Sequence, residues 1–237
     1  MTEFPQVPEP LSSASDEERA TLAWLLEVEQ APAELGSAEI ARLGDLLGDL
    51  SKTIRRHAAA AMTEALRSGV VTTLVCEVLL RDREASRRWG TAFALVRSQR
   101  AELSGDVLAE FLAALGNDDG DVRWAAAANL AVLARESSIL RDQLGALVGD
   151  DDPRRRKMAL LCLCEAGAHD GAVYRRALAD DDRYVRMAAL TGLARSADRS
   201  EFSLAAIARL ERDDADPGVQ RAAAAVLRRL QSLNPER

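Results

Sequence analysis

Residues 118–130 read DDGDVRWAAAANL, and residues 181–193 read DDRYVRMAALTGL. Each stretch runs from acidic residues through a Val-Arg pair into alanines and ends on a leucine. Similar segments recur along the chain, and their equivalent first residues are 33, 35, 33, 30 and 34 positions apart. A recurrence of this length predicts a repeat protein in which each unit is one supersecondary motif. The six first residues, called repeat position 0 below, are Ile54, Arg87, Val122, Arg155, Val185 and Val219.

Two later repeat positions are small or apolar in every unit. Position 4 is Ala or Thr, and position 8 is Leu or Met. Positions 0, 4, 8 and 11 share one face of a helix, so this face is predicted to be buried. The residues at position 4 and then at position 8 are Ala58, Thr91, Ala126, Ala159, Ala189, Ala223, Met62, Leu95, Leu130, Leu163, Leu193 and Leu227.

A second apolar segment precedes each of these helices, as in residues 40–47 and 202–210. Between the two segments, Asp152-Pro153 and Asp216-Pro217 are typical of a helix N-cap followed by proline at the first helical position. The sequence shows no period-two pattern of the kind that marks strands. Each unit is therefore predicted to be helix A, a short turn and helix B, and the chain an all-α solenoid of about six such units.

The predicted boundaries divide the chain into a tail, a cap and a repeat array. Three prolines in the first ten residues favour a flexible tail over residues 1–15. Residues 16–36 form a capping helix and a loop, because a terminal element must shield the open end of a solenoid core. The array covers residues 37–232, with units at about 37–69, 70–101, 104–136, 137–168, 169–197 and 199–232.

Composition and motifs exclude several classes of protein. The chain has a formal net charge of −7, and it lacks both a secretory signal and an apolar run long enough to span a membrane. Three cysteines without a framework favour a reducing, cytoplasmic location. The two histidines, His57 and His169, are far apart and have no metal-binding or triad spacing. We expect no metal, no cofactor and no catalytic residue, and no feature indicates an oligomeric state.

The outer side of helix B has an unexpected composition. Positions 2, 5, 6 and 9 point away from position 0, and in units two to five they are mostly apolar. One interpretation is a concave groove that holds a helix or peptide of a partner protein. The alternative is that some of these side chains form the core between repeats. The apolar candidates are Trp89, Phe93, Trp124, Leu160, Leu161, Met187 and Leu190, and the cationic ones are Arg56, Lys157 and Arg221.

The pattern Asp-x-x-x-Val-Arg-x-Ala-Ala-x-x-x-Leu resembles the HEAT repeat family, and the short units are similar to the bacterial HEAT-like repeats of phycobilin lyase-type proteins. The resemblance covers about residues 37–232. It implies a non-catalytic scaffold or adaptor that binds a partner on the concave helix-B surface. It also implies a structural ladder that links an Arg column to an Asp column, here Arg55, Arg88, Arg123, Arg156, Arg186, Asp118, Asp151 and Asp181.

Two other functions stay open at this stage. A phycobilin lyase-like protein could hold a tetrapyrrole in an apolar groove with cationic ends. A helical-repeat protein of the alkylpurine DNA glycosylase type would need a basic face and a carboxylate beside its tryptophans. The chain is acidic, and its predicted stripe has no carboxylate near Trp89 or Trp124. The sequence therefore favours a protein or peptide partner over nucleic acid.

Overall fold

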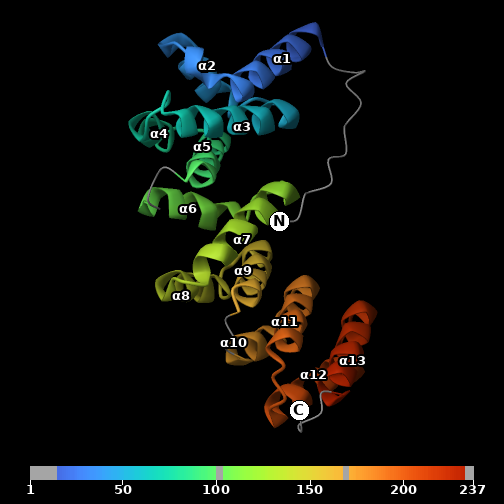
Figure 1. Cartoon of the computed structure of the whole chain (residues 1–237). Helices are drawn as coiled ribbons and strands as arrows, with labels where there is room; N and C mark the ends of the chain where they lie inside the picture. The colour runs from blue at the N-terminus through green and yellow to red at the C-terminus, as the bar shows by residue number, and fades with distance from the viewer. Residues whose placement is uncertain (1–14, 100–103, 168–170, 233–237) are drawn as a thin grey trace. The chain divides into compact units, whose positions relative to one another are not determined.

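A computed structural model describes residues 15–99, 104–167 and 171–232, and all regular structure in these ranges is helical (Figure 1). The predicted tail, apart from Ser15, and His169 lie outside these ranges. The elements are α1 (Asp16–Gln30), η2 (Pro32–Glu34), α2 (Ser37–Leu46), α3 (Lys52–Ser68), α4 (Thr73–Leu79), α5 (Ala85–Ser98), α6 (Gly105–Ala114), α7 (Gly120–Ala134), α8 (Ser138–Leu147), α9 (Pro153–Glu165), α10 (Gly171–Ala177), α11 (Arg183–Ser196), α12 (Glu201–Asp213) and α13 (Pro217–Ser232).

The chain divides into two compact units, Met1–Glu110 and Phe111–Arg237. In the first unit, α2 packs on α3 and α4 packs on α5. In the second unit, α8 packs on α9, α10 on α11 and α12 on α13. The predicted order of helix A, turn and helix B is therefore present in these pairs, and the fold is all-α with helix–turn–helix repeats.

Successive B helices also pack on each other within each unit. In the first unit α3 packs on α5, and in the second unit α7, α9, α11 and α13 form a continuous row. Figure 1 shows α9, α11 and α13 side by side. The N-terminal helix α1, within the segment 16–36, packs on α3 on the side away from α5.

The predicted core columns are confirmed by burial. All six residues at position 4 have no exposed area, and the six at position 8 are at most 7% exposed. Small side chains at position 4 allow the helices to approach closely, and the larger side chains at position 8 fill the space that remains. The fold therefore depends on a periodic core rather than on one central cluster.

The acidic turns begin helix B through side-chain caps. The carboxylates of Asp119, Asp152 and Asp182 accept hydrogen bonds from backbone N–H groups two residues later, at 2.8 to 2.9 Å. Asp216 accepts in the same way from Gly218, at 2.7 Å. The predicted caps before Pro153 and Pro217 are therefore present. Such caps satisfy N–H groups that have no partner inside the helix.

One close contact in the second unit permits a test of the packing. Gly192 on α11 lies against the ring of Tyr174 on α10, which is 1% exposed, and a Cβ at position 192 would lie 2.3 Å from two ring carbons. Gly192→Ala must displace this ring, so we expect it to lower the free energy of unfolding by about 1–3 kcal/mol. Urea unfolding followed by far-ultraviolet circular dichroism measures the change.

Gly145→Ala on α8 is the matched control for that substitution. A Cβ at position 145 meets no atom within 4 Å. Because alanine favours a helix over glycine by up to about 1 kcal/mol, this variant is expected to be neutral or more stable. Equal stability of the wild type and both variants would contradict the described contact between α10 and α11.

Candidate functional site

The arginines at position 1 bind the turn of their own repeat. One terminal nitrogen of each guanidinium donates to two successive turn carbonyls, at 2.5 to 3.1 Å. In the last repeat Gln220 replaces the arginine and donates to the carbonyl of Asp214 at 2.7 Å. These hydrogen bonds hold the loop between helices A and B against the start of helix B. The arginines that form them are Arg55, Arg88, Arg123, Arg156 and Arg186.

Some of these arginines also join one repeat to the next. Arg156 donates two hydrogen bonds of 2.8 Å to the carboxylate of Asp180. Arg186 donates two of 2.7 Å to the carboxylate of Asp214. In the first unit, Arg88 donates to Glu110 at 2.7 Å. A pair of parallel hydrogen bonds between a guanidinium and a carboxylate fixes the relative orientation of the two side chains and also contributes charge attraction.

The environment keeps the ladder carboxylates ionised. Burial is the largest influence on the pKa of the Asp214 carboxyl and acts to raise it. The hydrogen bonds from Arg186 and from the backbone N–H of Asp216, together with the charge of Arg186, outweigh burial, so the pKa lies below its ordinary value. The pKa of Asp180 is lowered in the same way. Burial of its carboxyl is again the largest influence, but the hydrogen bonds from Arg156 and from the backbone N–H of Asp182, together with the charges of Arg156 and Arg186, outweigh it. Both carboxylates therefore stay charged at neutral pH and pair with their arginines.

The carboxylates of the ladder belong to a different column from the one predicted. Toward the arginines at position 1, Asp118, Asp151 and Asp181 supply backbone carbonyls, whereas Asp180 and Asp214 at position −5 supply carboxylates. The carboxylate of Asp118 also joins two repeats, but it accepts from Arg154. In all six turns, the side-chain oxygen at position −5 also accepts a hydrogen bond from the backbone N–H two residues later. The first turn therefore also has an acidic residue in this role, Asp49. The six residues at position −5 are Asp49, Asp82, Asn117, Asp150, Asp180 and Asp214.

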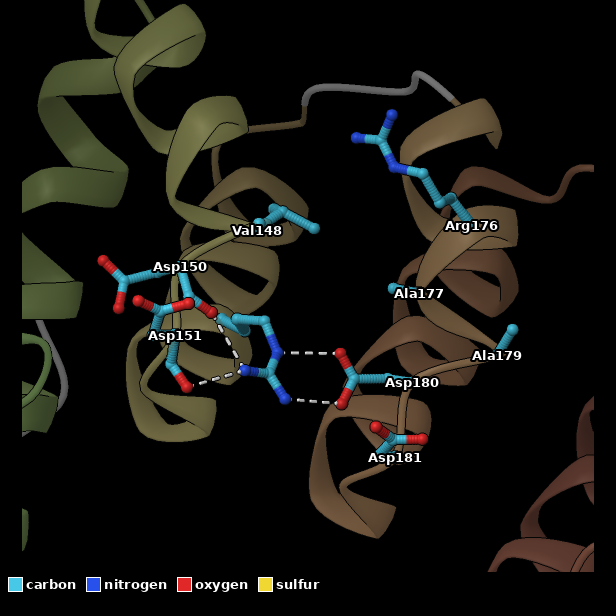
Figure 2. Close-up of a pocket in the computed structure, with 10 residues that line it drawn as sticks. Val148, Asp150, Asp151, Arg176, Ala177, Ala179, Asp180 and Asp181 are labelled. Atoms are coloured by element: carbon cyan, nitrogen blue, oxygen red, sulfur yellow. Dashed lines mark hydrogen bonds and ion pairs between the residues drawn. The ribbon is translucent and has the colours of Figure 1, made fainter.

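A pocket of about 440 Å³ lies between the turns of the fourth and fifth repeats (Figure 2). Its walls include four carboxylates, those of Asp150, Asp151, Asp180 and Asp181. The dashed lines in Figure 2 mark the hydrogen bonds of Arg156 to Asp180 and to the carbonyls of Asp150 and Asp151. The pocket is therefore part of the structural ladder, and we assign it no ligand.

Burial separates the predicted stripe into two parts. Leu160 and Leu190, both at position 5, are 0% and 1% exposed. They line no surface, so their prediction as partner-binding residues is wrong. Position 5 points toward the neighbouring B helix rather than away from the array, because α7, α9, α11 and α13 pack side by side. The residues at position 9 of the third, fourth and fifth repeats are buried for the same reason. They are Ala131, Cys164 and Ala194.

Positions 2 and 6 remain accessible in the second unit. Trp124 is 54% exposed and Met187 is 39% exposed, while Lys157 and Leu161 are half-buried. Positions −1 and 10 lie on the same side of each helix at helical spacing. We define the open face of the second unit as positions −1, 2, 6 and 10 of α7, α9, α11 and α13: Asp121, Trp124, Ala128, Val132, Arg154, Lys157, Leu161, Glu165, Tyr184, Met187, Thr191, Arg195, Gly218, Arg221, Ala225 and Arg229.

Tyr184 is an open-face residue that the sequence analysis missed. Its ring is 51% exposed and lies 6.0 Å from Nζ of Lys157 and 4.6 Å from the guanidinium carbon of Arg183. The same arginine donates to the Tyr184 hydroxyl at 2.6 Å. The signal that could have found Tyr184 is its place three residues before Met187, which puts both on one helical face.

The first unit contains the other predicted aromatics. Trp89 and Phe93 on α5 are both half-buried, and their ring centroids are 5.6 Å apart with an interplanar angle of 43°. Arg56 on α3 is exposed. These three residues therefore belong to a compact unit other than the one that holds Trp124, Lys157, Met187 and Arg221.

Two of the cysteines are buried, and the one described histidine is paired with a carboxylate. Burial raises the pKa of Cys76 and of Cys162 to about 12. His57 on α3 lies 2.9 Å from a carboxylate oxygen of Glu29 on α1. Within residues 15–99, 104–167 and 171–232, no group of three ligating side chains could hold a metal ion. In those same ranges, no helix is both long and apolar enough to cross a bilayer.

Comparison with solved structures identifies the class of fold. An archaeal HEAT-like repeats protein from Thermococcus onnurineus NA1 matches with a TM-score of 0.51 and 16% identity, over 93% of this chain and 98% of that one. YibA of Escherichia coli matches with a TM-score of 0.57 and 17% identity, over 96% of this chain and 80% of that one. No family model and no curated protein sequence matches the chain. The chain therefore has a HEAT-like repeat fold.

Proposed function

We propose that the chain is a non-catalytic scaffold or adaptor that binds a partner protein through the exposed faces of its B helices. The observation that carries the proposal is the open face of the second unit, where Trp124, Tyr184 and Met187 stay exposed on a fold with a complete core. Large side chains of this kind cost free energy in water and are common in the energetic centres of protein interfaces.

Two of the cysteines also favour a binding role over a catalytic one. The thiols of Cys76 and Cys162 stay protonated at neutral pH because burial raises their pKa to about 12. A protonated, buried thiol is a poor nucleophile. The tetrapyrrole-binding, lyase-like function remains the second candidate, and the half-buried Trp89–Phe93 pair in the first unit is the observation that favours it.

Photocrosslinking in the native cell tests where a partner binds. Trp124→p-benzoylphenylalanine places a photoreactive group on the open face, and Phe202→p-benzoylphenylalanine is the matched control. Phe202 is 79% exposed but lies on α12, an A helix. We expect irradiation to join a specific protein to the first variant and not to the second. Adducts at residue 202 alone, or the same adducts at both residues, would contradict the proposal.

A further inference from the structure

The open face of the second unit has a charge opposite to that of the whole chain. The chain has a formal net charge of −7, whereas the sixteen open-face residues include five cations and two carboxylates. The cations come from three different helices, so no single helix end explains their excess. They are Arg154, Lys157, Arg195, Arg221 and Arg229.

Three of the charged residues on this face are already paired. Glu165 accepts a hydrogen bond from Arg195, and Arg154 is held by Asp118 and Asp152 at the turns. Among the described residues, Lys157 and Arg221 form no ion pair. Both occupy position 2, the same position as Trp124 and Met187. Two unpaired cations therefore alternate with two exposed apolar side chains across the neighbouring helices α7, α9, α11 and α13.

Lys157 is also held beside an aromatic ring. Its ammonium group lies 6.0 Å from the ring centroid of Tyr184, on the next B helix. Such a contact is weak at an exposed site and leaves the charge available to a second partner. A ligand that contacts this point meets a positive charge and an aromatic surface together.

From this arrangement we infer that the open face binds an acidic peptide segment that carries apolar anchor residues. This inference rests on the proposed function and names the chemistry of its partner. Carboxylates of the peptide pair with Lys157 and Arg221, and its apolar side chains pack on Trp124, Tyr184 and Met187. Complementary charge of this kind steers association and selects among partners.

A peptide fits this face better than a nucleic acid does. Nucleic-acid binding depends on many unopposed cations along a phosphate backbone. Here Asp121 and Glu165 lie on the same face, and the strongly acidic turns at residues 150–152 and 180–182 lie in the same unit. Met187, Leu161 and Val132 offer aliphatic contacts, which suit leucine or phenylalanine side chains.

Selection from a displayed library of random 16-residue peptides tests the inference with the full chain as bait. The test variant is Lys157→Glu with Arg221→Glu. The matched control is Arg209→Glu with Arg212→Glu, which makes the same charge change at two exposed arginines of α12. Circular dichroism and urea unfolding establish that all three proteins are folded.

We expect the wild type and the control to enrich acidic peptides that contain Phe, Leu, Met or Trp. Fluorescence anisotropy of the leading peptides should show a loss of affinity of about tenfold or more for the test variant and little change for the control. Enrichment of neutral or basic peptides that still depend on Trp124 would overturn the inference and leave the proposed function standing. Failure of any peptide to bind, together with no adduct at residue 124, would overturn both.

A fluorescein-labelled dT20 oligonucleotide is included as a second probe. We expect it to bind more weakly than the selected peptides at 150 mM salt. Tighter binding than the peptides, with a steep dependence on salt and on Lys157 and Arg221, would overturn the inference in favour of a nucleic acid.

Discussion

Arg186→Ala is expected to destabilise the chain by about 3–5 kcal/mol. The substitution leaves the carboxylate of Asp214, which is 3% exposed, without the two hydrogen bonds of 2.7 Å that hold it. It also removes the donor to the carbonyls of Asp180 and Asp181. A change of this size is a large part of the 5–15 kcal/mol that stabilises a typical folded protein. Denaturant unfolding followed by circular dichroism measures it.

Arg183→Ala is the control, because it removes an arginine three residues earlier on α11. Arg183 pairs with Asp216 at 2.9 Å, but its side chain is 53% exposed. Exposed pairs contribute about 0–1 kcal/mol, so the loss should be small. Addition of Asp214→Ala to Arg186→Ala removes the buried carboxylate and should recover part of the stability, reduced by the loss of the hydrogen bond that Asp214 accepts from the N–H of Asp216. Equal losses from the two single arginine variants would show that the ladder does not stabilise the array.

The periodic core and the Arg column could be predicted because each depends on local spacing. Residues four apart share a helical face, so Ala126 and Leu130 had to be buried together if the segment was helical. The same spacing placed Arg186 immediately after the turn. The acceptor of Arg186 lies 28 residues away, on Asp214, and only the packing of one repeat on the next brings them together.

The open face could be predicted only in part, because helical periodicity does not say where the neighbouring helix lies. Leu160 and Leu161 are adjacent in sequence and both point away from position 0. The packing of α9 between α7 and α11 buries the first and leaves the second half-exposed. Tyr184 was missed because position −1 lies at the start of the helix, where the sequence alone leaves the boundary uncertain.

The second large effect is expected on partner binding. Trp124→Ala with Met187→Ala removes two exposed side chains from the centre of the open face, and loss of such residues typically costs 2 kcal/mol or more, about 30-fold in affinity. The fold should remain intact because the two side chains are 54% and 39% exposed. Ile139→Ala with Phe202→Ala is the matched control, since these side chains are 71% and 79% exposed on α8 and α12.

Affinity capture from native cell lysate, quantified by mass spectrometry, compares the wild type with both double variants. We expect the proteins that crosslink at residue 124 to be recovered equally by the wild type and by the Ile139→Ala/Phe202→Ala control. Their recovery should fall by about tenfold or more with the Trp124→Ala/Met187→Ala variant. Equal recovery by all three baits, or loss with the control alone, would contradict binding through the open face.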